Sequence, residues 1–466
     1  MEPDEKTIDA MLKDFIKVLK QDENNNPYNR KNYDGKKDAV PIISKNIVTN
    51  SELIRLIFNQ SFDFREFQNI HLYHKNGFFE NMGPYEEKMV LLPQILAPGF
   101  GMFMGESTFQ KYLNRTQGQL VKPTVLSLAA GQGFLDHDLI KHVTSKTFMH
   151  GAQMYSTLSQ FFGQNAEFII SDIGNNALKS LPIELKEITK RPDLENRVHI
   201  IKIDAMDFNF SGRDLGLIYT NELVDNLPTE PIALHEGNLY CIKIIAYNLC
   251  GIGEQFGDAL KIEKGVPSVK GVISKDQIKA RIEAGDTDSI GFATLFIPVE
   301  YDPFIKAQVE SISSISNISN SDFGGIYPLH IGLDPVLKSI KNSFRRGNFT
   351  LMDYTSSANG AQNYSVSISQ FQDLRFGKSD IDFKIDSAQV IERALKQGFF
   401  NPEKENLSHY AEIMMQLTMI SGKEGIQRQQ KVMGREYQFG QEKPVIMAMS
   451  MGLSLTNMFD YISLDF

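Results

Sequence analysis

The sequence of 466 residues contains two cysteines and no tryptophan. The two cysteines, Cys241 and Cys250, are too few for a disulfide framework or for a zinc site built from thiolates. Neither has an activating histidine beside it in the sequence, so we expect both to be small buried residues. The sequence therefore predicts neither structural disulfides nor thiolate metal sites.

Long apolar runs and an excess of positive charge are also missing. No uninterrupted apolar run approaches the ~18 residues that span a bilayer, and the acidic N-terminus resembles neither a secretory signal nor an Arg-rich transit peptide. With 48 Lys and Arg against 57 Asp and Glu, the net charge is −9. A nucleic-acid binder would need a strong local basic patch. We therefore expect a cytoplasmic protein that binds neither membrane nor nucleic acid.

The length is about three times the ~150 residues of a typical domain, so we expect several structural regions. A hydrophobic fraction of 42% and a charged fraction of 23% are those of a folded globular protein. Apolar residues at helical spacing predict an amphipathic helix over residues 5–20, which a polar linker follows. The predicted regions are an N-terminal helix and linker (1–40), a helical substrate or lid region (41–120), the cofactor half of a core (121–239), an insertion (240–330), and the rest of the core with a C-terminal extension (331–466).

The core region alternates short apolar runs with helical patterns. The runs are Thr124–Leu128, Glu167–Ile170, Val198–Ile203 and Leu215–Tyr219. The first two gaps between them are long enough for a crossover helix, which is typical of parallel βα units. Residues 240–330 are less regular and include a low-complexity segment, Ser311–Ser321, that we expect to be an exposed loop. After it we expect a helix over Asp334–Arg346 and a strand over Asn348–Met352.

A glycine-containing turn follows the first predicted strand. The segment VLSLAAGQGFL places Gly131 and Gly133 between this strand and a predicted helix, Asp136–Thr144. Glycines permit a tight turn and let a ligand lie against bare backbone near the positive end of the helix. Small residues at this point also serve simply to pack strand against helix. Because Asp136 occupies the place of a third glycine, the spacing disfavours a dinucleotide oxidoreductase.

Carboxylates follow the later strands. Asp172 ends the second strand, where it could accept hydrogen bonds from a ribose diol, and Asp204 ends the third, where it could accept an adenine amino group. The fourth strand leads into Asn221–Pro228, which contains Glu222 and Asp225. Each of these residues has a local alternative, since carboxylates also cap helices or lie in solvated loops, and Asp225 with Asn226 could end a short helical turn.

The order of these segments resembles that of a class I S-adenosylmethionine-dependent methyltransferase. The block NELVDNLP at residues 221–228 is similar to the NEFFDALP signature of the MidA-like family, which includes a mitochondrial complex I assembly methyltransferase. Further landmarks come in the family's order: YHKNGFF at 73–79, FRRGNFTLMDY at 344–354, GKSDIDFKID at 377–386 and MGREY at 433–437.

The resemblance implies a Rossmann-like α/β core with a mostly parallel sheet, to which helical N-terminal, inserted and C-terminal elements are added. It also implies S-adenosyl-L-methionine as cofactor and a protein substrate methylated on arginine. The residues themselves predict no metal site, and a homodimer stays open. The cofactor-binding residues that the resemblance implies are Ala129, Gly131, Gly133, Asp172, Ile173, Asp204 and Ala205. The catalytic residues that it implies are Asn221, Glu222 and Asp225, with the carboxylates orienting and polarising the guanidinium.

The sequence departs from the family's pattern at several positions. Ser127 and Ala129 stand where the family has an acid and a glycine, Gln94 stands where it has an upstream acid, and Thr355 replaces the glycine of its DYG block. These departures motivate an alternative to the methyltransferase function: a catalytically reduced methyltransferase-fold protein that acts as a binding or assembly factor.

Overall fold

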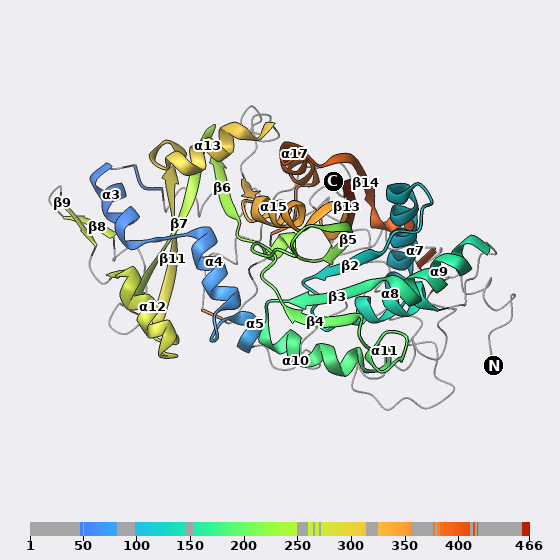
Figure 1. Ribbon diagram of the computed structural model, residues 1–466. Helices are drawn as coiled ribbons and strands as arrows, with labels where there is room; N and C mark the ends of the chain where they lie inside the picture. Colours follow the sequence, from blue (N-terminus) through green and yellow to red (C-terminus); the bar gives the residue numbers. More distant parts are fainter. Residues whose placement is uncertain are drawn as a thin grey trace, which may run out of the picture.

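The chain forms two β-sheets with helices packed around them (Figure 1). The structure, a computed structural model, describes residues 47–49, 51–81, 98–145, 153–248, 260–263, 266–269, 272–313, 325–355, 376–377, 381, 383–410, 413–414, 417 and 459–466. Several predicted features lie wholly or mostly outside these residues: the N-terminal helix and linker, Gln94, Cys250, the segment 433–437, and most of Ser311–Ser321.

The larger sheet has seven strands in the order β14-β15-β13-β5-β2-β3-β4. Their bounds are β2 Pro123–Leu128, β3 Glu167–Asp172, β4 Val198–Lys202, β5 Arg213–Asn221, β13 Phe344–Tyr354, β14 Phe400–Asn406 and β15 Phe459–Asp465. β15 is antiparallel to both of its neighbours, and the other pairings are parallel. The mostly parallel α/β sheet expected from the sequence is therefore confirmed, and all four predicted core strands are present.

Helices cover both faces of this sheet, so its central strands are buried on both sides. Val125 of β2 lies in the core that faces helices α7 (Pro98–Thr116), α8 (Phe134–Thr144), α9 (Gln153–Asn165), α10 (Asn175–Glu184) and α11 (Lys186–Thr189). Its neighbour Leu126 points to the other core, which α15 (Leu333–Ser343) and α17 (Ser387–Lys396) cover. Burial on both faces explains why β2 reads as a continuous apolar run rather than an alternating one.

The helix predicted over Asp334–Arg346 is shorter than expected. α15 ends at Ser343, and β13 takes the chain from Phe344 onward. The prediction was wrong at this end because Arg345 and Arg346 are polar and look like a helix end. In the structure, Phe344 and Arg346 instead pair with the start of β5.

The second sheet lies in the other half of the molecule, at the left of Figure 1, and is antiparallel. Its strands are β1 Phe62–Asp63, β6 Glu230–His235, β7 Asn238–Asn248, β10 Val272–Ile273, β11 Ile290–Pro298 and β12 Gly325–Leu329, and a separate pair is formed by β8 Leu260–Glu263 and β9 Val266–Val269. The described part of 240–330 is more regular than the sequence suggested. β7 is an 11-residue strand that pairs with β11 along nine register positions, Tyr240 to Asn248.

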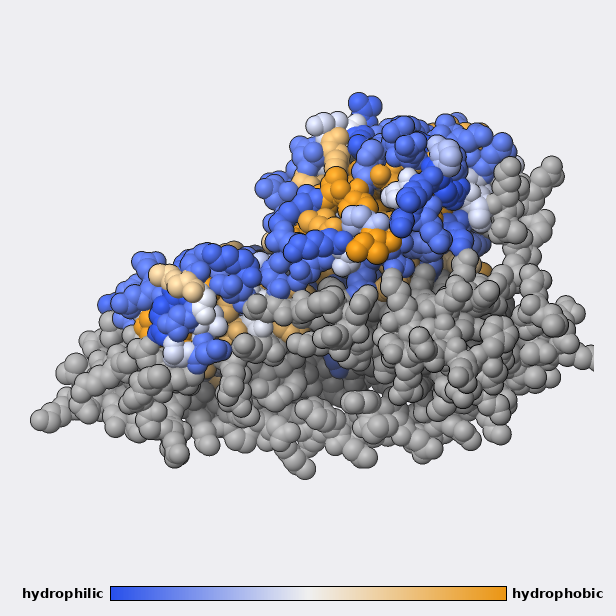
Figure 2. Space-filling view, turned by 90° about the horizontal axis from the view of Figure 1, so that it is seen from below, coloured by the Kyte–Doolittle hydropathy of each residue, from blue (hydrophilic) through white to orange (hydrophobic). Residues whose placement is uncertain are grey.

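Helices pack around this second sheet as well, and they are α3 Ser51–Gln60, α4 Phe64–Tyr73, α12 Lys275–Glu283 and α13 Pro303–Ser311. The short helix α5, Phe78–Asn81, follows α4 and contacts α10 of the other half. Seen from below, the described residues that reach the surface are mostly hydrophilic, and hydrophobic ones gather in a patch over the half that holds the parallel sheet (Figure 2). Among the described residues, no helix has both the length and the hydropathy needed to cross a membrane.

Strands β5 and β13 approach each other at a pair of glycines. Gly216 and Gly347 are register partners, and a Cβ atom on Gly347 would lie 2.0 Å from the carbonyl oxygen of Gly216 and 2.6 Å from the ring of Phe466. Gly347 also exchanges two backbone hydrogen bonds with Phe466, at 3.1 and 3.2 Å. The close approach of these strands therefore requires glycine at position 347.

We predict that Gly347→Ala destabilises the protein by about 3 kcal/mol, since the added methyl group must push β5 and β13 apart. Gly163→Ala is the matched control, because its Cβ atom would meet only ordinary contacts from 3.8 Å outward in helix α9. The control should be neutral or raise stability by up to about 1 kcal/mol, because alanine favours helix. Urea midpoints of both variants measure this, and equal midpoints would contradict the account.

Candidate functional site

The carboxyl ends of the parallel strands meet at one edge of the larger sheet. The chain runs outward from β2 through β3 to β4, then returns to place β5 on the other side of β2. Ligands of open α/β sheets bind at such a switch in strand order, beyond the carboxyl ends of the strands. All the sequence-predicted site residues lie at these strand ends or in the segments that follow them, so the structure brings them to the same edge.

The turn after β2, residues 129–133, which we call the glycine turn, has the backbone geometry that its small residues suggest. Ala129, Gly131 and Gly133 have φ angles of 58°, 56° and 85°. At Gly133, a Cβ atom would lie 2.6 Å from the Leu181 side chain, so glycine is needed for packing against α10. At Gly131, a Cβ atom would meet nothing within 4 Å. The backbone at Gly131 therefore has an open side against which a ligand can lie.

Asp172 binds this turn to the end of β3. One of its carboxylate oxygens accepts a hydrogen bond from the Gly131 N–H (2.9 Å), and the other accepts one from the Gly174 N–H (2.8 Å). Burial raises the pKa of Asp172, while these two N–H groups act to lower it. Each carboxylate oxygen has a second lone pair, so the side chain can still accept hydrogen bonds from a diol.

Asp204, Ala205 and Ile173 lie at the same edge. The carboxylate of Asp204 accepts a hydrogen bond from the Met206 N–H (2.9 Å), and its carbonyl oxygen accepts one from the Asp207 N–H (3.0 Å). Asp204 thus shapes the turn that follows β4, as the local alternative predicted. Its role toward adenine stays a prediction.

The segment after β5 forms a short turn built on a carboxylate from β13. Val224–Asn226 is a 3-10 turn, as the local interpretation of Asp225 and Asn226 predicted. The fully buried carboxylate of Asp353 accepts hydrogen bonds from the N–H groups of Val224 (2.7 Å), Asp225 (3.2 Å) and Tyr354 (2.8 Å). Burial raises the pKa of Asp353 well above its usual value, and the charge of nearby Glu222 raises it further.

We call one group of side chains the acidic turn: Asn221, Glu222, Asp225, Asn226 and Asp353. It contains two amides, Asn221 and Asn226. Each asparagine donates to a neighbouring carboxylate, Asn221 to Glu222 (3.1 Å) and Asn226 to Asp225 (2.9 Å). The Oδ1 atoms of both amides are buried and have no hydrogen-bond partner in the described part of the chain. Unpaired buried acceptors of this kind cost about 1–3 kcal/mol each. The acidic turn is therefore suited to a guest that donates N–H groups.

Sequence reasoning missed Asp353 and Asn226. Like the predicted carboxylates, Asp353 is an acid at the carboxyl end of a parallel strand. Its place near the end of the FRRGNFTLMDY landmark could have identified it from the sequence. Nothing in the sequence showed that the Asn226 amide would be buried.

The histidines at the end of helix α4 and the described cysteine have structural contacts of their own. His71 is buried and contacts the ring of Phe376, whereas His74 pairs with Glu283 at 2.8 Å. No group of three or more metal-binding side chains is present among the described residues. Cys241 is buried, as predicted, and burial raises the pKa of its thiol to about 12.

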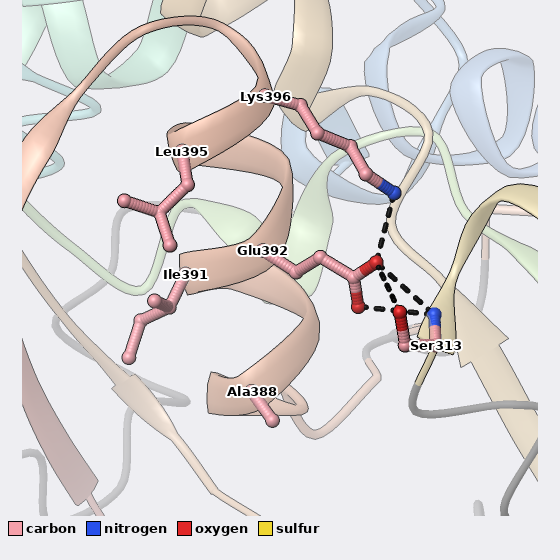
Figure 3. A pocket seen from close by; sticks show the side chains of 6 residues that line it. All are labelled: Ser313, Ala388, Ile391, Glu392, Leu395 and Lys396. Carbon is pink, nitrogen blue, oxygen red and sulfur yellow. Dashed lines mark hydrogen bonds and ion pairs between the residues drawn. The ribbon is translucent and has the colours of Figure 1, made fainter.

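A surface pocket lies on α17, where Ile391, Glu392 and Leu395 line it together with Ser313, which lies two residues beyond the end of α13 (Figure 3). Glu392 accepts hydrogen bonds from the N–H and hydroxyl of Ser313 (3.0 and 3.1 Å). No residue of the glycine turn or of the acidic turn lines this pocket.

We predict that Ala129→Gly stabilises the protein. An L-residue in the left-handed region costs about 1–2 kcal/mol, and the added freedom of glycine in the unfolded chain costs about 0.4–1 kcal/mol. The net gain should be roughly 0.5–1 kcal/mol. The neighbouring Ala130→Gly is the control, because Ala130 has no positive φ and should lose stability. Thermal denaturation of the two variants checks the opposite signs, and a loss in both would contradict the strain.

Comparisons with known proteins bear on the fold. No protein-family model matches the sequence, and no curated protein matches it. Among solved structures, an uncharacterized superfamily protein from Burkholderia thailandensis is similar at 13% identity, with a TM-score of 0.52 over 93% of this chain and 94% of that chain. A structure of a COG1565 superfamily member from the same organism, bound to S-adenosyl-homocysteine, is similar at 10% identity, with the same coverage and TM-score. The chain therefore has the fold of these COG1565 superfamily structures.

Proposed function

We propose that this chain is an S-adenosylmethionine-dependent methyltransferase that acts on an arginine side chain of a protein. The observation that carries the proposal is that two turns lie at one switch point. One is the glycine turn, which is open on one side and bound to Asp172, and the other is the acidic turn, which is rich in hydrogen-bond acceptors. A structure with the same fold binds S-adenosyl-homocysteine, the product that such a reaction would leave.

The residues present suit this cofactor. The backbone of Gly131 is open on one side, and Asp172 offers the carboxylate that a ribose diol requires. Ala129 and Gly133 hold the turn in its left-handed conformation. Ile173, Asp204 and Ala205 lie beyond the next two strands, where an adenosine would extend along the edge of the sheet.

The acidic turn suits a guanidinium. Arginine has five N–H donors in a planar fork and no acceptor. Glu222 and Asp225 offer carboxylates, and Asn221 and Asn226 offer amide oxygens without a hydrogen-bond partner in the described part of the chain. A lysine ammonium is a point charge with three donors and would leave more of these acceptors unsatisfied.

When bound, S-adenosylmethionine supplies a methyl group that is activated by its sulfonium and transferred in line. The protein contributes mainly proximity and orientation. Glu222 and Asp225 orient the guanidinium, Asn221 positions Glu222, and Asp353 holds the turn through three backbone N–H groups. Burial and the charge of Glu222 raise the pKa of Asp353. Glu222, beside the bound guanidinium, is placed to take the proton that the methylated nitrogen releases.

We predict that the protein binds S-adenosyl-homocysteine in calorimetry and that Asp172→Ala weakens binding about tenfold to a hundredfold, as loss of a charged hydrogen bond does. Asp193→Ala, at an exposed residue paired with Arg191, is the control and should leave the affinity unchanged. Absence of binding by the unaltered protein at millimolar ligand would refute the cofactor proposal. If the Asp172→Ala variant still performs the protein's function in cells, the assembly-factor alternative is favoured.

We predict that Glu222→Gln lowers the methylation rate by about a hundredfold, the usual effect of removing one preorganised electrostatic contact, while the affinity for S-adenosyl-homocysteine stays the same. The probes are two random peptide libraries that differ only in a fixed arginine or a fixed lysine. Mass spectrometry should find methylation in the arginine library. Methylation of the lysine library, or a rate unchanged in Glu222→Gln, would count against the acceptor assignment.

A further inference from the structure

A fully buried carboxylate lies under the glycine turn and has no part in the site described above. Asp136 is the third residue of α8, and its side chain is 0% exposed. One carboxylate oxygen accepts a hydrogen bond from the Tyr219 hydroxyl (2.6 Å). The Ser127 hydroxyl and the backbone N–H of Asp136 also act to lower the pKa of the carboxyl group. The other oxygen, Oδ2, has no partner in the described part of the chain.

The position of Asp136 follows from the local chain path. Helix α8 begins directly after Gly133, whose carbonyl oxygen accepts a hydrogen bond from the His137 N–H (2.8 Å). The first turn of α8 therefore packs on the strand ends at the switch point, with Ser127 from β2 and Tyr219 from β5 against Asp136. Asp172 of β3 is near enough for its charge to affect Asp136. The unpaired oxygen thus lies among the strands that form the proposed cofactor site.

The cation that would normally pair with such a group is missing from the described residues. The neighbouring histidines have other partners: His137 pairs with Asp138 (3.0 Å) and approaches Glu187 of α11 (4.0 Å), and His142 pairs with Glu106 of α7 (2.7 Å). Helix α9, which packs on α8, contains no charged residue. A buried carboxylate is unfavourable unless it is paired, so this one requires a partner that the described chain does not supply.

This inference rests on the proposed function. We propose that Asp136 supplies the negative charge that pairs with the cationic portion of the bound cofactor. The cofactor then binds preferentially when Asp136 is ionised. The low dielectric around the carboxylate makes such a charge effective. The pairing accounts for the unpaired Oδ2, for the two hydroxyl donors that support the ionised form, and for the position under the glycine turn.

The pH dependence follows from the surroundings of Asp136. Burial raises its pKa to about 6, and the charge of Asp172 acts in the same direction, while the hydroxyls of Ser127 and Tyr219 and the backbone N–H of Asp136 oppose it. A cationic ligand stabilises the ionised form, so the pKa is lower in the complex than in the free protein. Below pH ~6, binding must then release a proton, and affinity falls by up to about tenfold per pH unit. Above pH ~7, affinity is independent of this group.

The experiment is calorimetric titration with S-adenosylmethionine and with S-adenosyl-homocysteine between pH 5 and 8, in two buffers of different ionisation enthalpy. The unaltered protein should release a proton on binding near pH 5.5, and the effect should be larger for the sulfonium ligand. Asp136→Asn should bind about tenfold more weakly at pH 7.5 and lose the proton release. Asp138→Asn, two positions along the same helix, should keep the pH profile.

The outcomes separate this inference from the proposed function. Two outcomes would overturn the role of Asp136 and leave the cofactor proposal standing. One is proton release that persists unchanged in folded Asp136→Asn, and the other is binding by the unaltered protein without proton release. Absence of binding at every pH would refute both. Tyr219→Phe gives an independent readout if Asp136→Asn does not fold. Loss of the hydroxyl donor should move the midpoint of the pH profile upward, and an unmoved midpoint would count against the inference.

Discussion

The parallel pairing of β2 with β5 is the constraint on which the rest of the structure depends. The strands lie side by side although β3 and β4 come between them in the chain, and six register pairs from Pro123 to Leu128 hold them together. Because both strands end at the same edge, the glycine turn after β2 and the acidic turn after β5 are brought next to each other. Asp172 then fixes one turn and Asp353 fixes the other, each through backbone N–H groups.

The acidic turn is also the junction between the two sheets. The chain leaves it at Pro228 and enters β6 at Glu230, the first strand of the antiparallel sheet along this part of the chain. Helix α4 contacts the junction from the other side, since the Gln68 side chain accepts a hydrogen bond from the Thr229 N–H (2.9 Å) and the Tyr73 hydroxyl donates to the Asn226 carbonyl oxygen (3.3 Å). The second sheet and α4 are therefore placed to influence which acceptor reaches the acidic turn.

The sequence predicted the parallel core well, because central parallel strands are continuous apolar runs and polar residues mark their ends. It predicted the second sheet badly, since β7 and β11 mix apolar residues with Lys243 and Thr294, whose burial depends on partners distant in the chain. Lys243 is buried between Asp63 (2.5 Å) and Asp302 (2.7 Å), which no local pattern reveals. For the same reason, Asp136 looked like an ordinary residue of the first helical turn. Its importance depends on Ser127 and Tyr219, one from each strand at the switch point.

The measurement that tests the account most directly is a crystal structure of the protein grown with S-adenosyl-homocysteine. The account predicts ligand density at the carboxyl edge of the parallel sheet, with the ribose hydroxyls against Asp172 and the homocysteine portion along the open side of Gly131. Density at another place, such as the pocket on α17, or an edge left without ligand at saturating concentration, would contradict it.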